Sequence, residues 1–301
     1  MEYTLQPDEA VSDGIKRIID GKIETGLRQV DSDLDRHETV HEVRKRCKEI
    51  RAALRLVRGV LPTYSEENAH YRDAARRLSD IRDAQALIET FDDHGIPAIE
   101  AFDEEIQDDV DTLSERLVAR RESVTAEQDL SERLQKVRSE LLAGRKRVSS
   151  LPIATEGFAA LEGGLRKSYK RGRNRMAEAY ETPEAERFHE WRKRIKYHRY
   201  HTRLLRSVWS GPMKARRAEL KTLSDLIGDE HDLAVFLETM QAETLFDSDT
   251  RRTLYLGIMG RRAKLQRQGR PIGEQLFAES PEALVARIRK YWTAAREYET
   301  A

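Results

Sequence analysis

A run of eleven residues occurs twice in this chain, and the repetition constrains the fold more than any other feature of the sequence. The first copy extends from His41 to Arg51 and the second, 148 positions later, from His189 to Arg199. The histidine, the glutamate after it and every basic residue of the first copy recur, and two more arginines downstream bring the agreement to seven basic positions. Because Lys and Arg make up 54 of the 301 residues, seven such coincidences have a chance probability on the order of 10⁻⁵. We infer a duplicated unit.

A second element recurs at nearly the same distance. Leu78–Asp83 aligns with Ile227–Asp232 at an offset of 149, and an apolar helical segment follows both. In each copy a small residue and an (Arg/His)-Asp pair predict the start of a helix. The sequence therefore predicts two tandem helical bundles, over residues 1–145 and 158–301, with the aperiodic stretch 146–157 as their linker.

Helical spacing of apolar side chains extends along almost the whole chain. In the first helix, apolar residues recur at intervals of three and four from Ile15 to Leu34, and a second helix is predicted from near Glu38 to before Pro62. Prolines at the first helical position predict further helix starts, at Pro97, Pro183 and Pro281. No segment alternates with a period of two, so we predict an all-α fold of two tandem antiparallel bundles.

The cations of each repeated helix fall on one side of a helical wheel, opposite to an apolar side. In the first copy only Arg46 points away from this basic stripe. A helix face that is merely solvated usually places acids four residues from its cations, yet Glu49 is the only acid between Arg44 and Arg58. Because an anion would relieve the repulsion within the stripe, the pattern predicts a polyanion site; a solvated face is the alternative.

Charge is segregated elsewhere in the chain as well. Arg166–Arg175 holds six cations and no acid, whereas Asp83–Glu115 holds twelve Asp and Glu and no Lys or Arg. The formal net charge of zero, 54 cations against 54 acids, therefore argues only against a uniformly cationic surface. We expect the positive potential to be concave and internal and the acids to face outward as a solvated face, with a cation site or a contact for a basic partner as the alternatives.

The duplicated His-x-x-Arg-Lys-Arg-x-Lys-x-x-Arg helix, followed in each copy by the (Arg/His)-Asp element, resembles the CHAD domain, the conserved histidine α-helical domain, over nearly the whole chain. Ser79 stands where that family usually has glycine. The resemblance implies two bundles related by pseudo-two-fold symmetry around a basic central cavity, binding of inorganic polyphosphate and association with polyphosphate granules. The matching positions, implied to bind polyphosphate, are His41, Arg44, Lys45, Lys48, Arg51, Arg55, Arg82, His189, Arg192, Lys193, Lys196, Arg199, Arg203 and His231. The basic run adds Lys170, Arg171 and Arg173, without an equivalent in the first half.

The chemistry of these residues suits a phosphate chain, which presents anionic oxygens and no base edges. Arginine gives bidentate contacts and lysine a point charge. The aromatic side chains that single-stranded nucleic acids stack on are scarce, with Tyr200 alone near the second stripe. A nucleic-acid or anionic-membrane binding module is the alternative function. We expect His41 and His189 to gain protons beside phosphate as the pH falls, a capping or packing role being the alternative.

An enzymatic function is disfavoured. His231-Asp232 resembles the motif of metal-dependent His-Asp phosphohydrolases, but Arg82 occupies the equivalent position of the first repeat and cannot bind a metal. The chain has no Walker-type loop and no Glu-x-Glu-x-Lys signature, so we expect no catalytic residue, metal or cofactor, and polyphosphate-metabolising enzymes would act in trans. The single Cys47, together with the lack of a long apolar run and of a leader, predicts a cytoplasmic protein without a membrane span, located at polyphosphate granules.

Overall fold

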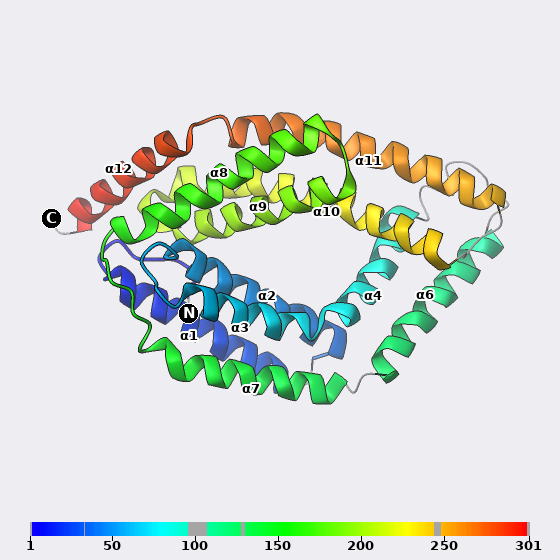
Figure 1. Ribbon diagram of the computed structural model, residues 1–301, viewed down its shortest axis with the longest axis horizontal. Helices are drawn as coiled ribbons and strands as arrows, with labels where there is room; N and C mark the ends of the chain where they lie inside the picture. Colours follow the sequence, from blue (N-terminus) through cyan, green and yellow to red (C-terminus); the bar gives the residue numbers. More distant parts are fainter. Residues whose placement is uncertain (1, 33, 96–106, 128–129, 244–247, 300–301) are drawn as a thin grey trace.

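Every regular element in the described part of the chain is helical, which confirms the predicted all-α class. The computed structural model describes residues 2–32, 34–95, 107–127, 130–243 and 248–299 (Figure 1). Its α-helices are α1 (Val11–Val30), α2 (Arg36–Leu56), α3 (Tyr64–Arg76), α4 (Ser79–Thr90), α6 (Gln107–Glu127), α7 (Leu130–Val148), α8 (Ala159–Glu181), α9 (Ala185–Leu204), α10 (Ser210–Glu243), α11 (Ser248–Leu276) and α12 (Pro281–Glu299). A π-helical turn, Phe91–Gly95, continues α4, and a 3₁₀ turn, Arg206–Val208, follows α9.

The first bundle consists of α1, α2, α3 and α7, which pack against one another. The apolar side chains of α1 from Ile15 to Leu27 are buried as their spacing predicts. The helix ends at Val30, however, and Leu34 is 39% exposed, so the predicted extension of the apolar face to Leu34 is wrong. The reason is the next helix start: the Asp35 side chain accepts hydrogen bonds from the backbone N–H groups of the first turn of α2, and such an N-cap fixes the chain in a non-helical turn before it.

The second bundle is formed by α8, α9, α10, α11 and α12, whose buried aromatic side chains include Tyr169, Phe188 and Trp191. Helix α12 begins at Pro281, as predicted, and α9 begins at Ala185, two residues after Pro183. The predicted start at Pro97 lies outside the described residues.

The second (Arg/His)-Asp element does not begin a helix. In the first half the chain breaks between α3 and α4, and Ser79 opens the new helix. In the second half Ile227–Asp232 lies in the interior of the 34-residue helix α10, so the predicted helix start is wrong there. A glycine inside a helix costs about 1 kcal/mol, and burial of Leu223, Ile227 and Leu233 outweighs that cost, because each buried aliphatic side chain contributes about 1.5–3 kcal/mol.

The connection between the bundles begins later than the sequence predicts. Helix α7 continues to Val148 and α8 begins at Ala159, so the segment without regular structure is 149–158 rather than 146–157. Gly157 has a φ of +64°, a left-handed conformation that favours glycine. The pseudo-two-fold relation between the bundles stays a prediction.

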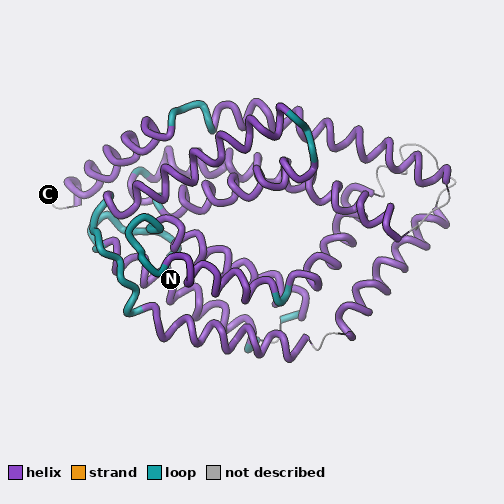
Figure 2. The backbone as a smooth tube through the Cα atoms, viewed as in Figure 1, coloured by secondary structure: helices purple, strands orange, loops and turns teal. Residues whose placement is uncertain are grey.

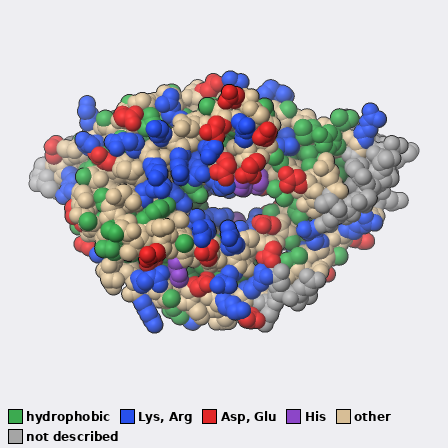
Figure 3. Space-filling view, in the orientation of Figure 1, with side chains coloured by type: hydrophobic (Ala, Val, Ile, Leu, Met, Phe, Trp, Pro, Cys, Tyr) green, Lys and Arg blue, Asp and Glu red, His purple; other side chains and the backbone are tan. Residues whose placement is uncertain are grey.

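The two bundles meet on two sides of the molecule. On one side α2 packs against α8 and α9, and on the other α4 packs against α10, which gives the backbone the form of an elongated ring (Figures 1 and 2). A large apolar core extends through both bundles, and a second core lies where α4 and α6 meet α10 and α11. The space-filling view shows an opening between the two contact regions, with Lys and Arg side chains gathered on one side of it (Figure 3).

Candidate polyanion-binding site

Helices α2 and α9 carry the duplicated basic stripe, and both bury the apolar side that the wheel predicts. Val43, Cys47 and Ile50 of α2 are fully buried, as are Trp191 and Ile195 of α9. The two helices contact each other. Cationic residues of one helix lower the pKa values of lysines on the other, as described below, so cationic residues of both helices lie close together.

Lys48 and Lys196, at equivalent positions of the two repeats, are the centre of this arrangement. Burial by the surrounding protein lowers the pKa of Lys48 to about 8, with further contributions from Arg44 and Arg192. Burial lowers the pKa of Lys196 to about 7, followed by the charges of Arg192 and Lys48. Lys48 nevertheless reaches solvent, and neither lysine forms an ion pair or hydrogen bond within the described part of the chain. An anion at this place would supply the missing counter-charge.

Three arginines of α2 donate hydrogen bonds to the protein itself. Arg44 donates to the backbone carbonyl of Ala75, at the end of α3, at 2.8 Å. Arg51 and Arg55 both donate to the side-chain oxygen of Asn68, at 3.1 and 3.3 Å. These contacts hold the guanidinium groups in place and leave fewer of their donors for a ligand.

The arginines of α9 are held more loosely by carboxylates of α10. Arg192 lies 3.5 Å from Asp232, and Arg199 lies 3.9 Å from Asp225. The buried Nε atoms of Arg192 and of its equivalent Arg44 both lack a hydrogen-bond partner in the described structure, so the two repeats do not differ there. It is the long distances of Arg192 and Arg199 from their carboxylates that leave donors a ligand could use.

Lys45 and Lys193 are paired in the same way in both repeats. Lys45 contacts Glu42 at 2.7 Å, and Lys193 contacts Glu190. Burial disfavours the charged form of Glu42, but hydrogen bonds from Lys45 and Arg46 outweigh it and lower its pKa to about 2. Because both lysines are partly exposed and already neutralised, they are weaker candidates for ligand contacts than Lys48 and Lys196.

The histidines differ between the repeats. The Nδ1 of His189 lies 3.0 Å from the Nε2 of His231, in a hydrogen bond between the two rings. Burial and then the charge of His189 lower the pKa of His231 to about 3, and burial followed by Lys193 lowers that of His189. Burial and the charge of Arg82 lower the pKa of His41. The rings are thus neutral at pH 7, and the expected protonation requires a bound anion to raise their pKa values.

Arg82 is held by Glu89, an acid of the segment Asp83–Glu115 that we expected to face outward. Both terminal nitrogens of Arg82 donate to the carboxylate of Glu89 at 2.6 Å, and the charge of Asp83 acts on Arg44 and Lys48. The acids in the first turns of this segment do reach solvent, since Asp83 is exposed and the Glu89 side chain is 45% exposed, but α4 turns Glu89 to the same side as Arg82, with which it pairs. Residues 96–106 of that segment lie outside the described residues.

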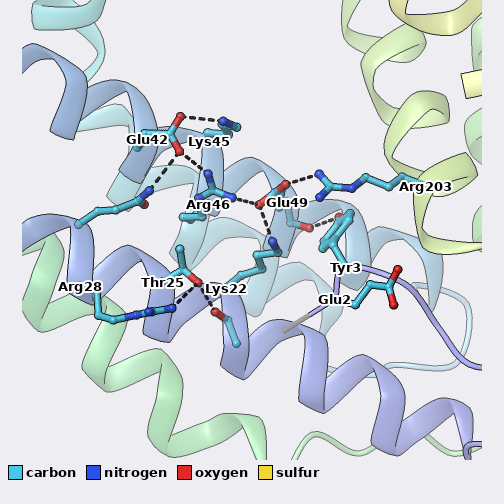
Figure 4. A network of polar contacts seen from close by, with 12 residues as sticks. Glu2, Tyr3, Lys22, Thr25, Arg28, Glu42, Lys45, Arg46, Glu49 and Arg203 are labelled. Carbon is cyan, nitrogen blue, oxygen red and sulfur yellow. Dashed lines mark hydrogen bonds and ion pairs between the residues drawn. The ribbon is translucent and has the colours of Figure 1, made fainter. Parts of the chain in front are cut away.

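Arg203 is occupied by a buried carboxylate of the other repeat. Glu49 is 1% exposed and lies between Arg203 at 2.9 Å, Arg46 at 2.6 Å and Lys22 at 3.3 Å (Figure 4). Tyr3 donates a hydrogen bond to the backbone carbonyl of Glu49 at 2.7 Å. The structure assigns Arg203 to the junction between the bundles, and the only sequence signal for this role was the single acid within the basic stripe.

Arg55 makes the reciprocal contact across the same junction. Its guanidinium carbon lies 3.7 Å from the centroid of the Tyr197 ring, and Arg55 is 6% exposed. Arg55 and Arg203 are equivalent in the repeat, as are Glu49 and Tyr197. Each basic helix therefore sends the same arginine to the same position of the other helix, where one meets a carboxylate and the other an aromatic ring.

The three predicted residues of α8 are all exposed but do not share one surface. Arg171 lies near Arg58, just beyond the end of α2, and its charge lowers the pKa of Arg58. Arg173 instead lines a groove against α11, together with Met176, Arg270 and Phe277. Lys170 lies between these directions on the helical wheel. A run of cations in sequence becomes two surfaces because α8 turns by 100° per residue.

Metal ligation has no support in the described ranges, where no group of three or more His, Cys, Asp and Glu residues is arranged to hold an ion. Among the described helices, none combines the length and apolarity needed to cross a membrane.

These features define an all-α protein in which two joined helical bundles bring a duplicated pair of cationic helices together. The CHAD domain profile matches residues 20–241, and the chain belongs to the CHAD domain family, which confirms the resemblance seen in the motifs. The fold is similar to the crystal structure of the CHAD domain from the plant Ricinus communis, with a TM-score of 0.53 and 17% sequence identity over 97% of this chain and 94% of that one. A comparison with curated proteins gave no match.

Proposed function

We propose that this chain is a non-catalytic inorganic polyphosphate-binding protein that holds the phosphate chain in a central cavity lined by Lys, Arg and His. The observation that carries the proposal is the pair Lys48 and Lys196, equivalent lysines of the two repeats that repel each other: the charge of Lys48 lowers the pKa of Lys196, and neither lysine forms an ion pair in the described structure. Membership of the CHAD family supports the choice of polyphosphate as the anion. Arg192 and Arg199, loosely held by carboxylates, would add bidentate contacts to phosphate oxygens.

Charge reversal in the second repeat tests the binding site. Polyphosphate titrated into the unmodified protein should bind at micromolar or tighter affinity and weaken steeply with salt, because counterions are released. The double variant Arg192→Glu/Lys196→Glu should lose about a hundredfold or more in affinity. The matched control is Lys264→Glu/Arg267→Glu, an exposed Lys and Arg pair on α11, which should lose far less. Unchanged affinity in the first variant would show that the site lies elsewhere.

The absence of catalysis has its own test. The purified protein, incubated with polyphosphate and Mg²⁺ or Mn²⁺, should release no phosphate. Burial already opposes proton uptake by His231, and Arg82 replaces it in the first repeat. Phosphate release that disappears in the His231→Ala variant would refute the non-catalytic assignment.

Competition separates polyphosphate from the alternative ligands. Polyphosphate should displace duplex DNA and anionic vesicles from the protein, and binding should not depend on nucleic-acid sequence. DNA or vesicles that resist displacement would favour the nucleic-acid or membrane function instead.

We place the protein in the cytoplasm, at polyphosphate granules and beside the enzymes that make and degrade the polymer. A fluorescent fusion should sediment with isolated granules, and the Arg192→Glu/Lys196→Glu variant should not. Equal sedimentation of both forms would contradict binding through this site.

A further inference from the structure

Helix α8 crosses the end of α2 at backbone contact. A Cβ atom at Gly164 would lie 1.9 Å from the carbonyl oxygen of Leu56 and 2.5 Å from that of Arg55, so only glycine permits the approach. The crossing brings the next turns of α8, with Lys167 and Arg171, to Arg58, two residues beyond the end of α2.

Arg58, Lys167 and Arg171 form what we call the outer basic cluster. Lys167 and Arg171 are exposed, and Arg58 lies over the ring of Tyr64 at 4.8 Å. None of the three forms an ion pair with a residue of the described ranges. The charges of Arg58 and Arg171 lower the pKa of Lys167, and burial followed by the charge of Arg171 lowers that of Arg58. Three cations thus repel one another in a place that solvent reaches, and no carboxylate of the described ranges pairs with them.

The outer basic cluster lies at the end of the basic stripe of α2, three residues beyond Arg55. The charges of Arg55 and Arg194 also lower the pKa of Arg58. Both arginines lie over the ring of Tyr197, at 3.7 and 5.5 Å from its centroid. From Arg58, basic residues follow α2 at intervals of three or four residues to Lys48, about 5 Å of helix per step. Figure 3 shows Lys and Arg side chains gathered on one side of the opening.

We propose that the outer basic cluster is a second phosphate-binding surface, contacted only by polyphosphate chains long enough to extend from the central site across the end of α2. This inference rests on the proposed function, and it adds two residues, Arg58 and Lys167, and a dependence on chain length. A short chain fills the central site alone, whereas a long chain engages both surfaces at once. The second contact then occurs within one complex, at a high effective concentration.

Two chain lengths and two matched variants test the proposal. Lys167→Gln/Arg171→Gln removes two exposed cations of the cluster. Lys264→Gln/Arg267→Gln removes a Lys and an Arg that are equally exposed, on α11, and form no ion pair in the described structure. Affinity is measured by calorimetric titration with tripolyphosphate and with long-chain polyphosphate, at several salt concentrations.

The cluster variant should bind long chains roughly tenfold more weakly, with a salt dependence shallower by about 1.4 in the logarithmic slope, the value for two lost contacts to a single-stranded polyanion. Its affinity for tripolyphosphate should match that of the unmodified protein, and the control variant should show neither change. An equal loss for both lengths, or no loss for long chains, would overturn the inference. Failure of the unmodified protein to bind either ligand would instead contradict the proposed function.

Discussion

The two basic helices share their sequence pattern but use it differently. On α2, Arg44, Arg51 and Arg55 donate hydrogen bonds to the protein at 2.8–3.3 Å. On α9, the equivalents Arg192 and Arg199 reach carboxylates only at 3.5 and 3.9 Å, whereas Arg203 is held closely, by Glu49 at 2.9 Å. The arginines of the first repeat are therefore largely occupied by hydrogen bonds within the protein, and more of those in the second repeat are available to a ligand.

The cause lies in the helices that face the two stripes. The break between α3 and α4 frees the carbonyl of Ala75 for Arg44, whereas α10 continues through the equivalent place. Asn68, which accepts from two arginines of α2, is replaced at the offset of 149 by Arg217. Arg217 repels Arg199 and Arg203. One position thus offers an acceptor in the first half and a like charge in the second.

Loss of the Glu49 carboxylate should have the largest effect. Glu49→Gln leaves the buried Lys22 and the partly exposed Arg203 without their anion, while Arg46 keeps Glu42. Breaking a buried pair in this way costs about 3–5 kcal/mol. Urea unfolding should show that loss. The equivalent change in the second repeat, Tyr197→Leu, removes the ring under Arg55 and Arg194 but breaks no ion pair, and it should cost about 1–2 kcal/mol. An equal loss of unfolding free energy in both variants would mean that the carboxylate of Glu49 and the ring of Tyr197 stabilise the junction equally.

Acid sensitivity should belong to the second repeat. His198 and His201 are buried on α9, where the first repeat has Ile50 and Ala53. His201 donates to the carbonyl of Ala52 at 3.2 Å, which leaves its Nδ1 without a partner.

Burial lowers the pKa of His201 to about 3 and holds that of His198 well below its ordinary value, with Arg216 adding to the effect. The unfolded chain takes up protons below its ordinary pKa of about 6.5 and the folded chain does not, so stability is lost as the pH falls from that value toward the folded pKa. By pH 5 each histidine should cost about 2 kcal/mol. The variant His201→Gln, which keeps a donor for Ala52, should lose about a third of this pH dependence in urea titrations at pH 7.5 and 5, because His231, whose pKa burial also lowers to about 3, contributes as well. An unchanged slope would place the acid sensitivity elsewhere.

Proton uptake on binding should distinguish the two central lysines. Burial, Arg192, Lys48 and Arg199 lower the pKa of Lys196 to about 7, against the opposing effect of Asp232. A bound phosphate chain raises it, so binding takes up protons, and affinity should fall about tenfold between pH 7 and 9. Calorimetry in buffers of different ionisation enthalpy measures this uptake. Lys196→Arg should remove most of it near pH 7 while keeping the charge. If Lys48→Arg removes the proton uptake instead, the lysine that gains the proton on binding belongs to the first repeat and not to the second.

The sequence predicted what depends on local periodicity and failed where contacts between distant segments decide. The basic and apolar sides of α2 and α9 follow from a spacing of 3.6 residues, and the structure places them as expected. The role of Glu49 could not be predicted, because its partner Arg203 lies 154 residues away. The interior position of Ile227–Asp232 in α10 depends on burial against other helices, which a short motif does not report.

The carboxylate that holds Arg82 provides the smallest and most selective test of the comparison. Glu89→Gln removes the charge that binds both terminal nitrogens of Arg82 and should free that guanidinium for the phosphate chain, raising affinity by about two- to threefold. Glu238 is the equivalent residue of the second repeat; it is exposed and forms no ion pair in the described structure, so Glu238→Gln changes net charge equally without releasing a cation. An equal rise in both variants would reduce the effect to general electrostatics. A fall in affinity for Glu89→Gln would show that the carboxylate orients Arg82 toward the ligand. The hydrogen bonds that hold the cations of the first repeat would then position them for the phosphate chain and not compete with it.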